Sequence, residues 1–254
     1  MDWSNYLLSE KAPSSYAAHL GALKGRVWGI YDLSQLPEDV QFLGLQTPTK
    51  KSGKKYTNYN SIVGNKTIES IYITDIDTEK LEIFASLENL KYLQISDCRQ
   101  EDLPDLSSLK SLEVLVLSSL TKVNDVQFCC GLPNLKTLYI YNIPCMTDLM
   151  PITELNGTLT ELSLHHGMMS GTGTPVKNMN PIAALTNLQY LSFCLNIKDG
   201  NYDIASLLGL QKLVHLEMLP RYLKDGRGKQ LLEKLPGLKY LNGTLMVGQN
   251  DSRS

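Results

Sequence analysis

Residues 88–95 read Glu-Asn-Leu-Lys-Tyr-Leu-Gln-Ile, and residues 110–117 read Lys-Ser-Leu-Glu-Val-Leu-Val-Leu. Both stretches place apolar residues in the order Leu-x-x-Leu-x-Leu, with Ile allowed at the last place. A pattern that recurs at a fixed period decides the fold before any other feature does. The copies begin at Ile68, Leu90, Leu112, Leu135, Leu159, Leu188, Leu213 and Leu238.

The spacing between the copies is short and nearly regular. Successive first residues lie 22, 22, 23, 24, 29, 25 and 25 positions apart, and a degenerate copy, Val40-Leu43-Leu45, begins 28 positions before Ile68. A single copy cannot bury its own apolar side, so neighbouring copies must stack to form a continuous core. The sequence therefore predicts one elongated stack of repeats.

This pattern resembles the leucine-rich repeat family over about residues 40–245. The 22-residue copies resemble the short-repeat subclass shared by bacterial internalins and phosphatase regulatory subunits. The resemblance implies an α/β leucine-rich repeat solenoid, a curved horseshoe with a parallel sheet on its concave face. It implies about eight repeats, with one cap at the N-terminal end and one at the C-terminal end. The family usually places Asn or Cys three residues after the third apolar position, and only Cys98 and Asn196 match. In the family, these residues form a ladder of side chains, the asparagine ladder, that ties the turns to backbone groups. Here we expect apolar packing to take its place in most repeats, and the solenoid to be less regular.

Three segments are expected along the chain. Residues 1–66 form an N-terminal cap with one degenerate repeat and a Lys-rich loop, residues 67–247 hold the repeats and the C-terminal cap, and residues 248–254 form a frayed tail. Helices are expected within residues 5–23 and over residues 229–235, where Pro236 and Gly237 end the second helix.

Composition narrows the class of partner and the compartment. The chain has 254 residues with 24 basic and 26 acidic side chains, a net charge of -2, which argues against general binding of nucleic acid or anionic membranes. The sequence has no apolar run of about 18 residues, so it predicts no membrane span. The start shows no basic leader segment, and the five cysteines are odd in number. We therefore expect a cytoplasmic protein with reduced, mostly buried cysteines.

Strand geometry assigns a candidate binding face. Side chains alternate along a strand, so positions 3, 5, 7 and 8, counted from the first apolar residue, are expected on the concave surface. Six of these 32 positions are Tyr, where composition alone gives about two; none is Lys or Arg, where about three are expected, and four are carboxylates. Tyrosine buries a large area at low entropic cost, although it also simply favours strands. The predicted partner-binding residues are Tyr72, Tyr92, Tyr139, Tyr141, Glu161, His165, His166, Tyr190, His215 and Glu217.

No catalytic motif is present. The chain has no G-x-S-x-G, H-E-x-x-H or C-x-x-C pattern and no phosphate-binding loop with Lys-Ser/Thr. We expect no enzyme activity, no cofactor and no metal. A zinc site built from His165, His166, Cys194 and His215 stays open as an alternative, because imidazole and thiolate are good zinc ligands.

Two irregular segments interrupt the repeats. The Gly-rich stretch from Gly171 to Lys177 lies in the longest repeat and is expected to be a surface loop. Four lysines, Lys50, Lys51, Lys54 and Lys55, lie within residues 47–60, where a solvated hairpin is expected; a phosphate contact or a nuclear-import-like run is the alternative. Whether either segment contributes to binding stays open.

The sequence favours a non-enzymatic protein-interaction module that binds a protein partner with a basic surface through its Tyr-rich, mildly acidic concave face. It predicts neither nucleic acid nor a membrane as the partner. Three alternatives stay open: a cytosolic inhibitor or immunity protein against a basic toxin such as a nuclease, a phosphatase-type regulatory subunit, and the zinc-binding protein named above.

Overall fold

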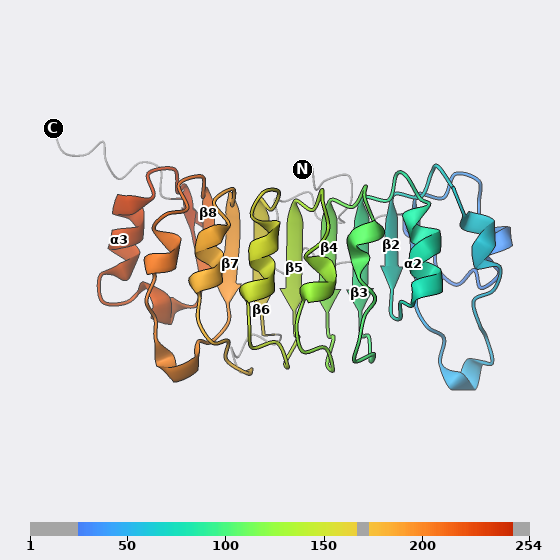
Figure 1. Cartoon of the computed structure of the whole chain (residues 1–254), viewed down its shortest axis with the longest axis horizontal. Coiled ribbons are helices and arrows are strands. Elements are labelled where there is room, and N and C mark those ends of the chain that lie inside the picture. The colour runs from blue at the N-terminus through green and yellow to red at the C-terminus, as the bar shows by residue number, and fades with distance from the viewer. Residues whose placement is uncertain (1–24, 167–172, 246–254) are drawn as a thin grey trace.

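The computed structural model describes residues 25–166 and 173–245, which form one continuous ten-stranded sheet (Figure 1). The strands follow one another in chain order; β1 to β9 are parallel, and β10 pairs antiparallel with β9. The strands are β1 (Phe42–Leu45), β2 (Ser70–Ile73), β3 (Tyr92–Ser96), β4 (Val114–Ser118), β5 (Thr137–Tyr141), β6 (Glu161–His165), β7 (Tyr190–Cys194), β8 (His215–Met218), β9 (Tyr240–Leu241) and β10 (Thr244–Leu245).

The register confirms the repeat alignment. Leu93 pairs with Leu115 and Ile95 with Leu117, so equivalent apolar positions lie side by side on successive strands. These four side chains are 0% exposed. The degenerate copy is a true repeat as well, because β1 pairs with β2 in the same register. The chain is thus a leucine-rich repeat solenoid, as the sequence predicts.

Short helices return the chain from one strand to the next and cover one side of the sheet (Figure 1). Among residues 25–166 and 173–245, two of these helices are α-helical, α2 (Thr78–Ala85) and α3 (Arg227–Lys234). The 3₁₀ turns are η2 (Leu33–Gln35), η3 (Lys50–Ser52), η4 (Tyr59–Ile62), η5 (Leu106–Ser108), η6 (Gln127–Cys129), η7 (Met150–Leu155), η8 (Asn180–Ala184), η9 (Lys198–Gly200), η10 (Ala205–Leu207) and η11 (Pro220–Leu223).

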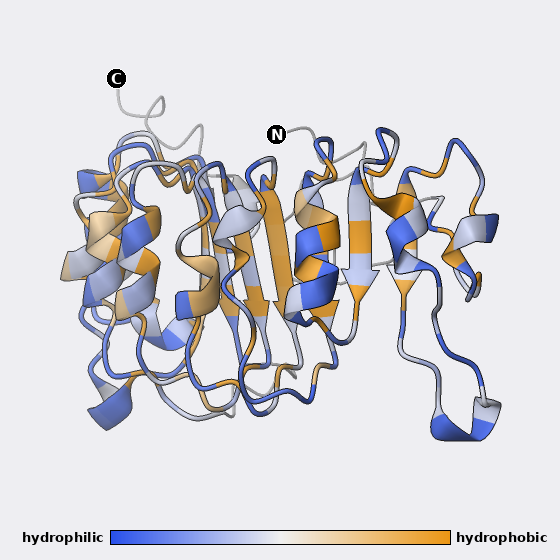
Figure 2. Cartoon of the chain, turned by 45° about the vertical axis from the view of Figure 1, so that its right-hand side comes forward, coloured by the Kyte–Doolittle hydropathy of each residue, from blue (hydrophilic) through white to orange (hydrophobic). Residues whose placement is uncertain are grey.

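The core lies between the sheet and these helices. Figure 2 shows apolar residues recurring in successive strands and in the helices beside them. Leu106, Ile152 and Leu207, from three different 3₁₀ turns, are 0% exposed. Burying one such side chain contributes about 1.5–3 kcal/mol, so the stacked repeats supply the stability that no single repeat has.

Apolar residues do replace the asparagine ladder. Ile76 and Leu120 are 0% exposed at positions where the family usually has Asn or Cys. Polar ties between repeats come instead from the asparagine that precedes the first leucine of a copy. The side-chain amides of Asn89 and Asn134 each donate to a backbone carbonyl of the preceding repeat at 2.7 Å.

An aspartate or asparagine starts most return segments. Its carboxylate or amide oxygen accepts from the backbone N–H two residues later, in the manner of an Asx turn. The distances are 2.9 Å at Asp105, Asp125, Asp148, Asn178 and Asp203. Each of these five side chains lies just before a short 3₁₀ turn.

The two ends differ in how well they match expectation. The predicted C-terminal helix is confirmed as α3, which begins two residues earlier, at Arg227, and ends before Pro236. Its Leu231 is fully buried against the last repeats. The helix expected within residues 5–23 and the tail expected after residue 247 lie outside the described residues. In the ranges 25–166 and 173–245, no helix is long and apolar enough to cross a membrane.

All five cysteines are free thiols. Cys98, Cys129 and Cys130 are buried, as expected, whereas Cys145 is exposed and Cys194 is intermediate. Cys129 and Cys130 are core residues, and each thiol contacts the carbonyl oxygen of Val126.

Candidate functional site

The sheet surface opposite the core, here called the concave face, carries the predicted binding residues. Nine of the ten lie on strands β2 to β8, at positions that alternate with the core residues. His166 lies one residue beyond the end of β6. The register brings Glu161, Tyr190 and His215 into one row across adjacent strands, and Tyr141 and His165 into another.

The tyrosines are far less exposed than a simple binding surface would have them. Tyr92, Tyr139 and Tyr190 are 0%, 2% and 6% exposed, and they form a second apolar cluster with Val114 and Val116. Large side chains on strands about 4.8 Å apart pack against one another, which the position count alone did not take into account. Tyr72 and Tyr141 keep intermediate exposure.

A hydrogen-bonded network occupies β6 to β8. Ser192 lies at its centre: its hydroxyl contacts Nε2 of His165 at 2.9 Å and donates to Oε2 of Glu217 at 3.2 Å. The hydroxyl of Tyr190 donates to the same Glu217 oxygen at 3.4 Å. One half-buried carboxylate therefore receives two hydroxyl donors from the neighbouring strand.

A second carboxylate is held in the same way between β5 and β6. Glu161 accepts from the hydroxyl of Thr137 at 3.1 Å and from the hydroxyl of Tyr139 at 3.2 Å. The two carboxylates lie two strands apart, with Tyr190 between them on β7. Each therefore has a tyrosine hydroxyl as a donor.

Aromatic rings connect these carboxylates. The ring centroids of Tyr139 and Tyr190 are 6.4 Å apart, those of Tyr190 and His215 are 4.9 Å apart, and His215 stacks on Tyr240 at 5.3 Å. Tyr240 is 37% exposed, so this row opens to solvent at β9. We call the whole group the polar cluster; its members are Thr137, Tyr139, Glu161, His165, Tyr190, Ser192, His215, Glu217 and Tyr240.

Burial sets the protonation states in the polar cluster. It lowers the pKa of His165 to about 4, against a smaller opposing effect of Glu217, so this imidazole is neutral at pH 7. Burial, together with the charge of the nearby carboxylates, raises the pKa of Tyr139 and of Tyr190. Both phenols therefore stay protonated and act as donors to the carboxylates. Burial likewise raises the pKa of Cys194 to about 11.

Ser192, His165 and Glu217 have the composition of a hydrolytic triad but not its connectivity. In a triad the imidazole links the serine to the acid, whereas here the serine hydroxyl links the imidazole to the carboxylate. Ser192 is also 0% exposed, and a histidine with a pKa near 4 is a weak general base at neutral pH. The three side chains therefore form a hydrogen-bonded network in which the serine hydroxyl is not activated as a nucleophile.

The structure does not arrange the four residues of the zinc alternative as a metal site. Nε2 of His166 accepts from the backbone N–H of Asn196 at 2.8 Å, and Nε2 of His165 is engaged with Ser192. Cys194 is a protonated thiol at neutral pH, whereas zinc binds the thiolate. In the part of the chain that is described, no group of three or more His, Cys, Asp or Glu residues could hold a metal ion.

The N-terminal end of the concave face holds a cationic side chain that does not belong to the 32 strand positions counted in the sequence. Arg26 precedes the first copy, yet its guanidinium lies 5.2 Å from the ring centroid of Trp28 and 5.0 Å from that of Tyr72, and it donates to Gln94 at 3.3 Å. Trp28 can lie flat on β1 because Gly44 leaves the room: a Cβ there would come within 2.3 Å of the indole. The prediction of a face without Lys or Arg is therefore wrong at this end.

Position 8 serves the turns. Asp97, Ser119 and Asn142 have φ values of 55°, 56° and 56°, and their backbone N–H groups donate to the carbonyls of Ser118, Tyr141 and His165 on the next strand. Left-handed backbone favours Asn and Asp among non-glycine residues. The sequence places position 8 on the concave surface by expectation, whereas Asp97, Ser119 and Asn142 belong to the turn that follows each strand.

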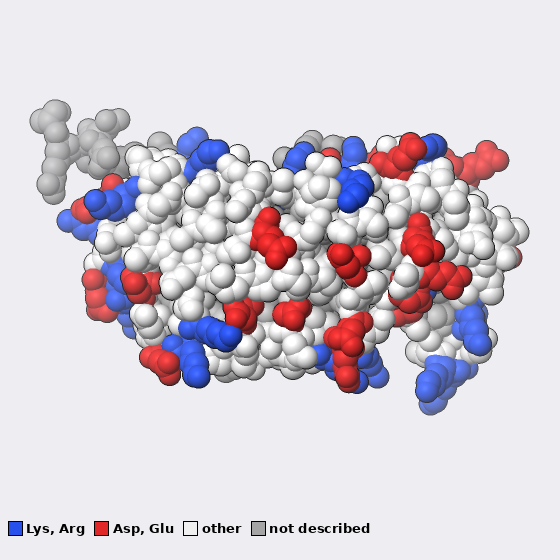
Figure 3. All heavy atoms as spheres, in the orientation of Figure 1, with Lys and Arg blue, Asp and Glu red and all other residues white. Residues whose placement is uncertain are grey.

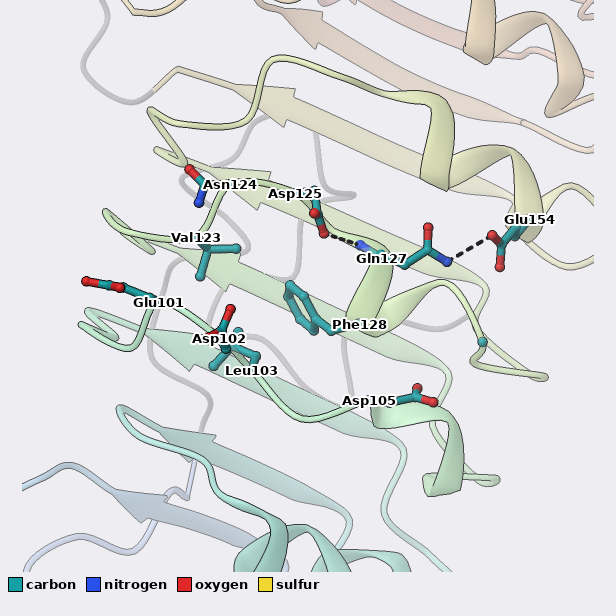
Figure 4. A pocket seen from close by; sticks show the side chains of 11 residues that line it. Glu101, Asp102, Leu103, Asp105, Val123, Asn124, Asp125, Gln127, Phe128 and Glu154 are labelled. Carbon is teal, nitrogen blue, oxygen red and sulfur yellow. Dashed lines mark hydrogen bonds between the residues drawn. The ribbon is translucent and has the colours of Figure 1, made fainter.

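A second acidic surface lies on the outer side, where the return segments run. Figure 3 shows carboxylates along the middle of this side and most basic residues towards its ends and edges. A hollow of about 460 Å³ lies between the segments that follow β3 and β4. Leu103 and Phe128 are among its lining residues (Figure 4). Its carboxylates are Glu101, Asp102, Asp105, Asp125 and Glu154.

These outer carboxylates have local partners. Glu154 accepts from the amide of Gln127 at 2.9 Å, Glu101 pairs with Lys122 at 3.0 Å, and Asp105 and Asp125 cap 3₁₀ turns. Exposed pairs of this kind contribute little individually. Sequence reasoning did not find this hollow, although the aspartate before each return segment was a visible signal.

Comparison with known proteins identifies the fold. No protein-family model matches the chain, and no curated protein matches it. Among solved structures, an internalin (InlF) from Listeria monocytogenes str. 4b F2365 matches with 22% identity and a TM-score of 0.50, over 80% of this chain and 54% of its own length. TLR13 in complex with ssRNA13 matches with 22% identity and a TM-score of 0.51, over 81% of this chain and 29% of its own length.

The class of protein follows from the register and from these matches: the chain has the leucine-rich repeat fold. An internalin C2 from the same Listeria strain, with 24% identity and a TM-score of 0.49, covers 73% of this chain and 74% of its own length. The chain spans about half the length of the InlF internalin. At these identities the likeness concerns the fold alone.

Proposed function

We propose that this protein is a non-enzymatic interaction module that binds a protein partner through the polar cluster of the concave face. The observation that carries the proposal is the pair of carboxylates, Glu161 and Glu217, each held by a tyrosine hydroxyl on the strand face. A carboxylate accepts a charge-assisted hydrogen bond from a basic group, so these two side chains favour a partner with a basic surface.

The chemistry of the cluster favours a basic group on the partner. Between the two carboxylates lies Tyr190, whose ring is tilted by 47° against that of His215. An arginine or lysine side chain from the partner donates a charge-assisted hydrogen bond to a carboxylate. The row of rings reaches solvent at Tyr240, where the same cation can contact an aromatic face.

Of the alternatives, a cytosolic inhibitor of a basic toxin draws on the same feature and stays a prediction. Such a role requires the same two carboxylates, so it names a kind of partner and not a different site. Among the described residues nothing favours the phosphatase-subunit alternative over it, and cytoplasmic location remains part of the proposal.

A charge-matched pair of variants tests the proposal. Glu161→Gln with Glu217→Gln removes both carboxylates of the polar cluster and keeps their shape. Glu101→Gln with Asp102→Asn removes two exposed carboxylates of the outer hollow and serves as the control. Affinity capture from the native host, quantified by mass spectrometry, should recover a partner with the unchanged chain and with the control, and about tenfold less with the first variant.

The contrary outcomes are clear. Equal loss with both variants would mean that net charge alone attracts the partner. Equal recovery with both, while each variant retains its folded circular-dichroism spectrum, would reject the polar cluster as the binding site.

A further inference from the structure

The insertion between β1 and β2 forms a basic hollow that the concave face does not explain. It accounts for the 28-residue spacing of the first two copies, and η3 lies at its tip, projecting beyond the stack at the N-terminal end (Figure 1, lower right). The hollow has a volume of about 500 Å³, within the usual range of about 300–1,000 Å³ for ligand pockets.

Lysines dominate the lining. Lys50, Lys54 and Lys55 come from the insertion, and Lys80 comes from α2. The carboxylate of Asp75 also lines the hollow, but it is paired with Lys80. Within residues 25–166 and 173–245, the three insertion lysines form no ion pair.

This clustering has a free-energy consequence. Like charges on a short loop repel one another, and the repulsion weakens only with salt or with a bound anion. No buried residue lies in η3, so this turn adds nothing to the core that would compensate. A multivalent anion placed among these ammonium groups would relieve the repulsion.

The walls are aromatic and firmly held. The hydroxyl of Tyr56 donates to the carbonyl of Gly44 at 3.2 Å, and the ammonium of Lys80 lies 5.9 Å from the ring centroid of Tyr59. Burial raises the pKa of Tyr56 and of Tyr59 to about 12, so neither phenol adds a negative charge near neutral pH. On the neighbouring wall, the backbone N–H of Thr47 donates to the hydroxyl of Thr74 at 2.8 Å, which fixes the insertion to β2.

We propose that this hollow binds a phosphate monoester, with Lys50, Lys54 and Lys55 contacting the phosphate oxygens and Tyr56 and Tyr59 contacting the organic group. A phosphate dianion presents three acceptor oxygens to several ammonium groups, as a single carboxylate cannot. The overall charge of -2 disfavours a long polyanion, so a compact ligand is the one that fits.

Titration calorimetry with phenyl phosphate, and separately with inorganic phosphate, tests this site on the full chain. Phenyl phosphate should bind with a dissociation constant in the micromolar to low-millimolar range, and inorganic phosphate about tenfold more weakly because it makes no contact with the tyrosines. If both bind equally, the ligand is free phosphate and the assignment of the aromatic walls is wrong.

A matched variant distinguishes a site from general attraction. Lys54→Gln with Lys55→Gln should weaken phenyl phosphate about tenfold. Lys110→Gln with Lys198→Gln removes the same charge from two exposed lysines outside the hollow and should leave the affinity unchanged. Equal affinity in all three proteins, or no binding of either phosphate compound at millimolar concentration, would overturn the proposal without touching the role of the polar cluster.

Discussion

The concave face joins two regions that use the same strand positions differently. On β3 and β4, Tyr92, Val114 and Val116 are fully buried and pack as an apolar patch. On β6 to β8, the equivalent positions carry Glu161, Ser192 and Glu217, which belong to the polar cluster. One backbone geometry thus supports a stabilising surface at one end and a hydrogen-bonding surface at the other.

The two regions differ in the contacts that they can offer to another molecule. Apolar contacts are non-directional, whereas hydrogen-bonded carboxylates favour one kind of charge in one place. Three substitutions and a change of pH test this division.

Tyr92→Ala should destabilise the protein most. The side chain is 0% exposed, and truncating a fully buried aromatic residue costs about 3–5 kcal/mol through lost burial and the cavity left behind. Urea unfolding measures the change, and Tyr240→Ala, at a position 37% exposed, is the matched control with an expected loss below about 1 kcal/mol. Equal losses in the two variants would mean that the patch does not stabilise the fold.

Acid should weaken the fold through His165. Its pKa is about 4 in the folded chain, below the ordinary 6.5, so below pH 6.5 the unfolded chain binds a proton that the folded chain refuses. Stability therefore falls as the pH drops from about 6.5 to about 4, by up to about 3 kcal/mol from this group. Denaturation at several pH values should show a shallower fall for His165→Gln, and parallel pH profiles would contradict the buried neutral imidazole.

Ser192→Ala and Ser163→Ala form a matched pair inside the polar end. The two serines pair in register on β6 and β7 and are 0% and 1% exposed, but among the described residues only the hydroxyl of Ser192 has partners. Ser192→Ala should cost about 1–2 kcal/mol, because it leaves Glu217 with fewer donors, whereas Ser163→Ala should be nearly neutral. Thermal or urea unfolding decides, and a larger loss at Ser163 would reverse the assignment of the network.

Arg26→Met gives the smallest expected effect. It removes the contacts with Trp28 and Tyr72, which contribute about 0.5–1 kcal/mol, and keeps most of the side-chain volume. Stability should fall by about that amount and partner capture should be unchanged. A loss of capture would extend the binding surface to the apolar end and remove the division between the two regions.

The repeat pattern allowed the fold to be predicted well. Leu93 and Leu115 lie side by side because a fixed spacing of apolar residues permits only one register, and a slip would expose the core. The faces of the strands followed from the same alternation. The C-terminal helix was found because Pro236 and Gly237 follow it.

The candidate site was predicted less completely, for physical reasons. Position counting places Tyr139 and Ser192 on one face but does not say that one hydroxyl will donate to Glu161 and the other to Glu217. Arg26 escaped notice because its side chain reaches the face from outside the repeats. Burial of Tyr92 depends on neighbours from several strands, which no single copy of the pattern encodes.

The asparagines that tie the repeats together have a direction. Asn89, Asn134 and Asn187 belong to the later repeat of each pair, and the carbonyl that accepts their amide belongs to the earlier one. Because a chain is synthesised from its N-terminus, the repeat that carries the accepting carbonyl is made before the repeat that carries the asparagine. Deleting repeats from the C-terminal end therefore removes amides together with their repeats, and every remaining amide keeps its carbonyl. Deleting repeats from the N-terminal end removes carbonyls and leaves the first remaining asparagine without its acceptor.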